Sequence, residues 1–252
     1  MKLTTPKQYG LSFISDEQLF LHVKETIDKY RFKINLKEFN KNLVDPIKLT
    51  FDAKVYGKSL EEIIESESIR QIDKSNTNHI GYFHQNIFKY LGANWVVPEM
   101  GYDVVNDVDK IYVEMKNKHN TMNSASSQKT YMKMQHKILR DDKATCYLVE
   151  VIAKNSQDIT WKVSIDGESL SNKNIRRISI DKFYSVVTGI ESAFKQLCEI
   201  LPQVIDDVIA ETNRGKIENS VFAELQDVSP NLIKSIYLLS FKKYEGFSEF
   251  NL

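Results

Sequence analysis

The sequence predicts one α/β domain with helical additions at both ends. Between residues 76 and 165 the hydrophobic pattern runs helix, strand, strand, helix, strand, strand, whereas the flanking segments have mainly helical spacing. The chain has 252 residues, 42% of them hydrophobic, with nine glycines and five prolines, which is the composition of an ordinary folded protein with a large core. We therefore expect a single domain over residues 1–252, with a helical part (1–75), a core (76–189) and a second helical part (190–252).

The first helical part is expected to contain three or four helices. Its start signals are side chains that cap a helix N-terminus, and Gly57 ends one helix before the last of these signals. The signals are Ser15 with Gln18, Asp45 followed by Pro46, and Ser59 with Glu62. Residues 59–74 then have apolar side chains at nearly helical spacing, so we expect one face of this segment to pack against the fold.

The core is expected to begin with a helix over residues 76–91, which ends at Gly92. The pattern then becomes strand-like over residues 101–106 and 110–116. Because Asp107-Val108-Asp109 separates these two runs, we expect them to pair as a hairpin.

The second half of the core repeats this order. Residues 123–139 have helical spacing and follow a Ser/Asn cluster that favours a helix start. Residues 145–152 are almost continuously apolar, which is typical of a strand covered on both faces, and we expect residues 159–165 to form its neighbour. A basic loop over residues 172–177 and a short strand over residues 178–180 precede a mostly helical remainder.

Composition excludes several classes of protein. Cys146 and Cys198 have no C-x-x-C spacing, so neither a disulfide framework nor a zinc site is expected. The sequence contains no signal-peptide pattern and no apolar run long enough to cross a membrane, so we expect a soluble, cytoplasmic protein that does not bind membranes. Thirty-four Lys and Arg residues balance thirty-four Asp and Glu residues.

The charges are nevertheless segregated along the chain. Residues 116–143 are strongly basic, and acidic residues gather at 61–67 and 206–218. Such a stretch is consistent with a nucleic-acid face, although by itself it is more often the solvated side of a helix.

The hairpin carries the candidate catalytic residues. Side chains alternate along a strand, so Glu114 and Lys116 point to the same side of the sheet, and Asp103 on the preceding strand can converge on them. Two carboxylates and the backbone carbonyl of Met115 form the oxygen donor set that Mg²⁺ prefers. With Lys116 beside it, this group suits phosphodiester hydrolysis. An exposed hairpin with a cross-strand salt bridge is the alternative interpretation.

Longer motifs around this triplet resemble a known family. The helix-hairpin-helix-strand order is similar to the restriction-endonuclease-like core, whose motif D-x(n)-(D/E)-x-K falls on the equivalent strand. The sequence over residues 76–189 resembles the type II restriction endonucleases of the PD-(D/E)XK superfamily that cut GGNCC or GGWCC sites. The motifs that carry this resemblance are HIGYFHQN (79–86), GYDV (101–104), VEMKNKHNTMN (113–123), SSQKTY (126–131), DKFY (181–184) and VTG (187–189).

The resemblance implies a Mg²⁺-dependent homodimer that cleaves both strands of a short palindrome in double-stranded DNA. It also implies a companion cytosine methyltransferase that protects the same site without binding stably to this chain. Asp103 and Glu114 would hold the metal together with the Met115 carbonyl, and Lys116 would serve the nucleophile. We favour Asp103 as the first carboxylate over Glu99, Asp107 and Asp109, because Asp103 lies on the strand that adjoins the triplet.

Other residues are candidates for auxiliary roles or for DNA contacts. Gln85 stands where related nucleases often have a helix glutamate, and a polar residue on an exposed helix side is the alternative. For His119 and Asn120, which follow the active strand, contact with DNA and a role in forming a turn are both open. Phosphate contacts are expected from the basic residues at the end of this strand and on the next helix, and guanine recognition from two arginines. These candidates are Lys118, Gln128, Lys129, Lys133, Arg176 and Arg177.

Two other functions remain open at this point. A repair or junction-resolving nuclease could be built on the same core, and it would prefer branched or damaged DNA. A catalytically dead DNA-binding protein is the second alternative, and Mg²⁺-dependent turnover distinguishes it from an enzyme.

Overall fold

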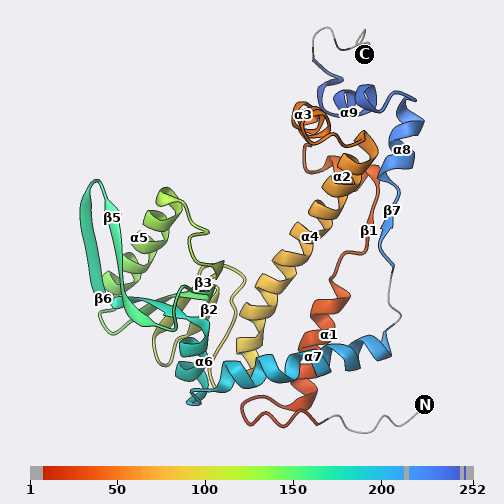
Figure 1. Cartoon of the computed structure of the whole chain (residues 1–252). Helices are drawn as coiled ribbons and strands as arrows, with labels where there is room; N and C mark the ends of the chain where they lie inside the picture. The colour runs from red at the N-terminus through yellow and green to blue at the C-terminus, as the bar shows by residue number, and fades with distance from the viewer. Residues whose placement is uncertain (1–7, 213–215, 245–246, 248–252) are drawn as a thin grey trace. The chain divides into compact units, whose positions relative to one another are not determined.

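A computed structural model describes residues 8–212, 216–244 and 247. The chain divides into two compact units, which are coloured along the sequence in Figure 1. The first, here called the sheet unit, comprises the residues up to Asp28 and Ile80–Thr212. The second, the helical unit, comprises Lys29–His79 and the residues after Thr212. The first and last parts of the predicted division, residues 1–75 and 190–252, each contribute to both units. The division of a single domain into three parts stays a prediction.

The sheet unit contains a five-stranded mixed sheet in the order β2-β3-β4-β6-β5. β2 and β3 form the predicted antiparallel hairpin, β3 is parallel to β4, β4 is parallel to β6, and β5 is antiparallel to β6. The strands are β2 (Val104–Asn106), β3 (Ile111–Lys118), β4 (Thr145–Ile152), β5 (Asp158–Ile165) and β6 (Glu168–Ser179). This sheet with its flanking helices confirms the predicted α/β fold class and is consistent with a restriction-endonuclease-like core.

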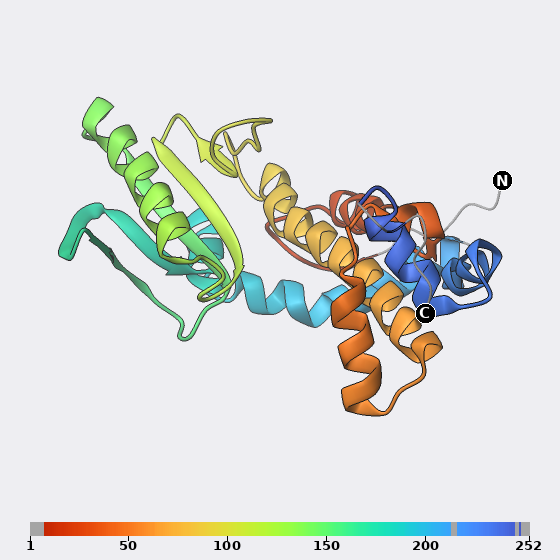
Figure 2. The same ribbon diagram turned by 90° about the horizontal axis from the view of Figure 1, so that it is seen from above.

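Helices cover both faces of this sheet. α5 lies along one face, as the two views agree (Figures 1 and 2). Its buried residues Tyr131 and Met134 pack with Cys146 and Leu148 of β4. The opposite face packs on the remaining helices of the unit. The helical segments of the sheet unit are α1 (Asp16–Asp28), the end of α4 (Leu60–Asn86), a 3₁₀ turn η1 (Ile87–Tyr90), α5 (Ser124–Arg140), α6 (Ile180–Thr188) and α7 (Ala193–Glu211).

The helical unit joins segments that are far apart in the sequence. Its strands β1 (Lys33–Ile34) and β7 (Glu218–Asn219) pair in parallel. The core around Phe39, Ile64 and Val221 is fully buried. Its helices are α2 (Leu36–Asn40), α3 (Pro46–Tyr56), the first part of α4, α8 (Val221–Val228) and α9 (Leu232–Phe241).

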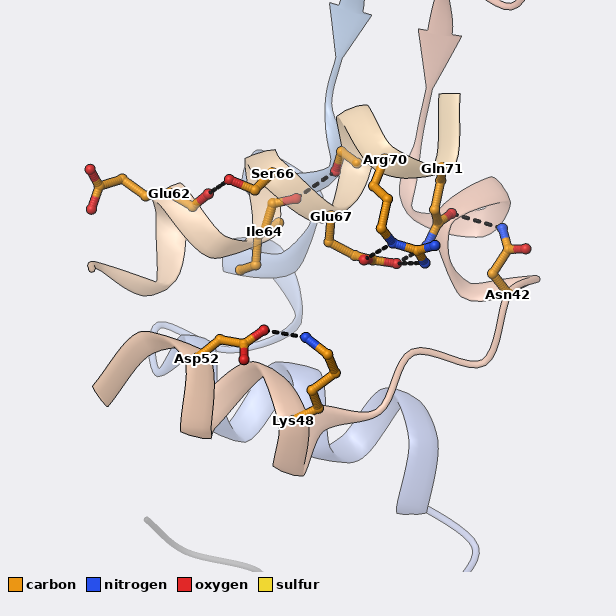
Figure 3. A network of polar contacts seen from close by, with 10 residues as sticks. Asn42, Lys48, Asp52, Glu62, Ile64, Ser66, Glu67, Arg70 and Gln71 are labelled. Carbon is orange, nitrogen blue, oxygen red and sulfur yellow. Dashed lines mark hydrogen bonds and ion pairs between the residues drawn. The ribbon is translucent and has the colours of Figure 1, made fainter. Parts of the chain in front are cut away.

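A polar network supports α4 inside the helical unit (Figure 3). The Glu67 carboxylate accepts two hydrogen bonds of 2.6 Å from the guanidinium of Arg70 and one of 3.0 Å from the Gln71 amide. The Gln71 side-chain oxygen accepts a bond of 2.8 Å from Asn42, just before α3. These bonds hold the buried Gln71 side chain against the loop that leads into α3.

Local start signals identified in the sequence are confirmed. Asp45 caps α3 by accepting from the N–H groups of Ile47 and Lys48. Ser59 and Glu62 form the reciprocal capping box that precedes α4. The helix that follows is longer than predicted, because the two expected helices over residues 59–74 and 76–91 are one continuous element. No Gly or Pro interrupts the junction near residue 75, so the backbone continues its helical hydrogen bonds.

The predicted basic loop over residues 172–177 is wrong, since these residues lie within β6. Arg176 forms an ion pair with Asp158 of β5, and Arg177 pairs with Glu150 of β4. Carboxylates on the two neighbouring strands thus neutralise the charges that indicated a loop. Across the described part of the chain, no helix is both long enough and apolar enough to pass through a membrane.

His84, near the end of α4, makes the stability of the sheet unit depend on pH. Burial lowers the pKa of His84 to about 4, and the nearby His22 adds a smaller repulsion. The unfolded chain takes up this proton near pH 6.5, so the free energy of unfolding falls by up to about 3 kcal/mol as the pH drops from 6.5 to 4. Thermal unfolding at several pH values should show a shallower acid decline for His84→Leu. The exposed His136, replaced by Leu, should retain the wild-type decline, and equal slopes in both variants would contradict this assignment.

Candidate active site

Glu114 and Lys116 lie on β3 and point to the sheet face that α5 covers. They share this face with Tyr112, which packs in the α5 cluster, whereas Val113 and Met115 belong to the core on the other face. The triplet therefore has the alternation predicted from the sequence. Glu114 is 8% exposed, and the Lys116 ammonium lies 3.8 Å from the Glu114 carboxylate.

Asp103 reaches the same place from the neighbouring strand. Its N–H donates to the Val113 carbonyl at 2.9 Å, which extends the β2–β3 pairing to Asp103. The Val104↔Val113 register then puts Asp103 next to Glu114. The Asp103 Oδ2 atom accepts a bond of 2.7 Å from the Met115 N–H. The structure thus brings Asp103 to the backbone of the triplet.

The Met115 carbonyl faces the same edge of β3. A residue in a strand directs its N–H and C=O groups to the same side, and the Met115 N–H points to Asp103. β2 begins only at Val104, so the backbone of β3 beyond Val113 has no β2 partner there. Two carboxylates and one carbonyl are therefore available at one edge of the hairpin.

Lys133 of α5 supplies a second cation to Glu114. The Lys133 ammonium contacts the Glu114 carboxylate directly and donates to the Gly101 carbonyl at 2.6 Å. It also lies 4.3 Å from the centre of the Tyr102 ring, within the range of a cation–π interaction. The buried carboxylate is thus held by two lysines, Lys116 and Lys133.

The donor set fits a hard divalent cation. Asp103, Glu114 and the Met115 carbonyl offer only oxygen atoms, which Mg²⁺ prefers while it keeps several waters. Within the described ranges, no three His, Cys, Asp or Glu residues gather as a metal cluster, so carbonyl and water oxygens would have to complete the shell. If such a cation bound the Glu114 oxygen that Lys133 now contacts, the Lys133 ammonium would have to move away from it.

The alternative acidic residues lie away from this arrangement. Glu99 is exposed in a bend of the loop before β2. Asp107 accepts from the Tyr112 hydroxyl at 2.8 Å, and Asp109 accepts from the Asn106 amide at 2.8 Å. The latter two carboxylates therefore stabilise the hairpin turn. Gln85 is partly buried near the end of α4, and its auxiliary role stays a prediction.

The predicted DNA-contacting residues fall into two groups. Lys118, Asn120 and Lys129 are exposed, and Asn120 adopts a φ of 60° in the turn after β3, which supports its turn-forming role. The others have partners within the protein. Gln128 donates to the Ser164 carbonyl at 2.9 Å, Arg176 lies 2.6 Å from Asp158, and Lys133, His119 and Arg177 contact carboxylates.

One buried charge escaped the sequence analysis. Glu150 of β4 is 2% exposed, and it pairs in register with Lys116 on β3. Its carboxylate contacts the Arg177 guanidinium and lies 3.1 Å from Nδ1 of His119. The signal was present, because Glu150 is an acidic residue in the apolar run of residues 145–152, but its partners come from β6 and from the turn after β3.

Comparisons with known proteins identify the family of the chain. Residues 11–210 match the family model described as Eco47II restriction endonuclease. The type II restriction enzyme Sau96I of Staphylococcus aureus is 35% identical over 229 residues, which are 85% of this chain and 87% of that protein. The type II restriction enzyme Eco47II of Escherichia coli is 32% identical over 216 residues, which are 80% of this chain and 89% of that protein.

Removal of Lys133 tests its pairing with Glu114. In metal-free buffer, Lys133→Met should lower the free energy of unfolding by about 1–3 kcal/mol, because a buried carboxylate loses its nearest donor. Added Mg²⁺ should raise the melting temperature of this variant more than that of the wild type, since no ammonium then competes for the same oxygens. The exposed Lys129, replaced by Met, should change stability by no more than about 0.5 kcal/mol. Equal behaviour of the two variants would contradict the pairing.

Proposed function

The chain is a type II restriction endonuclease that belongs to the Eco47II restriction endonuclease family, and we propose that it hydrolyses both strands of double-stranded DNA at a GGNCC- or GGWCC-like palindrome. The observation that carries the chemical part of this proposal is the position of Asp103 beside Glu114-Met115-Lys116. The palindrome is the class of site cut by the enzymes that the sequence motifs resemble. A soluble, cytoplasmic location remains part of the proposal.

Type II restriction endonucleases generally use a divalent metal ion, and we propose Mg²⁺ for this chain. Asp103, Glu114 and the Met115 carbonyl would hold it. When bound, the ion supplies positive charge to the phosphate and lowers the pKa of a coordinated water. All three donors lie on one hairpin, whose backbone bonds fix their spacing.

We propose that Lys116 acts on the scissile phosphate. Its ammonium is 3.8 Å from the Glu114 carboxylate and about one-third exposed, so it is oriented and accessible. It can donate hydrogen bonds to an attacking water or to the phosphate oxygens as negative charge develops. Lys133, once it leaves Glu114, carries a further positive charge at the same edge.

DNA binding would use the exposed residues around this edge. Lys118 and Asn120 follow β3 directly, and Lys129 is exposed one helical turn before Lys133 on α5. These side chains suit phosphate contacts, which fix the register of the duplex without reading sequence. Guanine recognition by Arg176 stays a prediction, since its Nε donates to Asp158 in this structure.

A palindromic site is related to itself by a two-fold axis, and a symmetric homodimer matches that symmetry. We propose that two copies of the chain act together, each cutting one strand. A companion cytosine methyltransferase would protect the same sequence in the host DNA without a stable complex.

The cleavage assay uses unmethylated plasmid DNA. We expect discrete fragments with Mg²⁺ and no cleavage with EDTA, and sequencing of the fragment ends gives both the recognised sequence and the position of the break. Random degradation, or preference for branched DNA over an intact duplex, would contradict the restriction assignment and favour a repair or junction-resolving nuclease.

Two substitutions test the assigned chemistry. Glu114→Gln and Lys116→Ala should each reduce the cleavage rate by at least about 10²-fold, because the lost charges act on the transition state. DNA affinity should change by less than about tenfold, since most of the phosphate contacts remain. Lys162, exposed on β5, offers a matched control, and Lys162→Ala should cut at the wild-type rate. A wild-type rate in either of the first two variants would remove the assigned mechanism.

Sedimentation equilibrium tests the dimer. The protein bound to a single-site duplex should have the mass of two chains and one duplex. A mass of one chain with one duplex, together with normal plasmid cleavage, would contradict the dimer and leave the nuclease assignment intact.

A further inference from the structure

Two strands and the turn after β3 bring a charged cluster together next to Lys116. Glu150 of β4 is almost completely buried, and it contacts the Arg177 guanidinium of β6. His119 follows β3 directly, and its Nδ1 atom lies 2.7 Å from Nη2 of Arg177 and 3.1 Å from the Glu150 carboxylate.

This cluster contributes little to the stability of the sheet for the desolvation that it requires. Moving two charges out of water costs several kcal/mol per ion, and a buried pair is often no better for stability than apolar side chains of the same volume. The neighbouring positions on β4 and β6 of the same face, Leu148 and Ile175, are indeed apolar and fully buried. A charged pair at the end of this face therefore points to a ligand.

A small cavity opens at the same position. It has a volume of about 70 Å³, and its wall includes Lys116, Lys118, Glu150 and Arg177 together with Asn120 and Ser127. Lys116 also lies near the Glu114 carboxylate, so Arg177 and Lys118 face the single carboxylate of Glu150 and leave an excess of positive charge. The Nε atom of Arg177 is buried and makes no hydrogen bond with any residue that the structure describes. A buried donor without an acceptor is unfavourable, and a ligand oxygen is the kind of acceptor that it lacks.

We propose that this cavity is an anion pocket that binds a phosphate of the DNA strand next to the scissile phosphate. Arg177 and Lys118 bind the phosphate oxygens. Glu150 is a positioning residue, because it holds the guanidinium in place through a charge-assisted hydrogen bond. The inference rests on the proposed function, since Lys116 lies on the wall shared by the pocket and the candidate active site. The cavity is large enough for a few waters, or for a phosphate group.

The test combines protein variants with DNA in which one phosphate at a time is a neutral methylphosphonate. Binding to duplexes that contain the recognised sequence is measured by fluorescence anisotropy with Ca²⁺ in place of Mg²⁺. Removing Arg177 alone would leave Glu150 buried without a cation, so the main variant is the double substitution Glu150→Gln with Arg177→Met. Circular dichroism and thermal unfolding establish that the variant is folded.

The wild type should lose about tenfold in affinity when the phosphate that enters the pocket is neutralised. In the double variant the same replacement should lower affinity by less than about threefold, because the Arg177 contact is already lost and only the Lys118 contact remains. The salt dependence of binding should also become shallower by about one phosphate contact. Lys173→Met is the matched control, since it removes an exposed charge from the same strand and should retain the tenfold sensitivity.

Wild-type sensitivity at every phosphate in a folded double variant would overturn the pocket. If inorganic phosphate raises the melting temperature of the wild type but no DNA phosphate is coupled to Arg177, the pocket takes a free anion and the proposal is also overturned. Plasmid cleavage by the wild type distinguishes failure of the anion pocket from failure of the proposed function. Site-specific cleavage without coupling refutes only the pocket, whereas absence of any site-specific cleavage refutes the proposed function.

Discussion

The structure depends on pairing two nearly buried carboxylates with cations beneath a helix. Glu114 and Glu150 are both nearly buried on the sheet face that α5 covers, where an isolated carboxylate would be very unfavourable. Cations from three different elements make this possible: Lys116 from β3, Lys133 from α5 and Arg177 from β6. The pairing fixes the position of each carboxylate more tightly than packing alone would. The candidate active site and the neighbouring cavity are two outcomes of this one electrostatic requirement.

The apolar and charged parts of this face have separate tasks. Tyr131, Met134 and Leu148 fill the space between α5 and the sheet and set how closely they approach. Glu114 and Lys133 bridge the same two layers at the edge of the hairpin, where the apolar cluster ends. A rigid sheet and a packed helix therefore hold the polar groups, and this is the arrangement that gives a reactive site precise geometry.

Sequence reasoning succeeded where the signal was local. Alternation along residues 110–116 placed Glu114 and Lys116 on one side, the Asp-Val-Asp turn placed Asp103 on the partner strand, and the capping residues Asp45 and Ser59 marked helix starts. It failed where a residue's environment comes from distant segments. The loop expected at Arg177 is a strand that pairs with β4, and the Arg177 guanidinium contacts the buried Glu150, 27 positions earlier. Likewise, nothing local to residues 33–34 indicates that they pair with residues 218–219.

The pairing of β1 with β7 has a consequence for how the protein is made. Every strand of the five-stranded sheet has been translated before β7, α8 and α9 leave the ribosome. Until then Phe39 and Ile64, which are fully buried in the finished protein, lack the cover of Val221 and Leu225. At ordinary rates of synthesis residues 180–225, which follow β6 and end at Leu225, take about 2–9 s to add. For that interval the nascent chain exposes the apolar surface around Phe39 and Ile64. A chaperone that shields this surface would act on the helical unit.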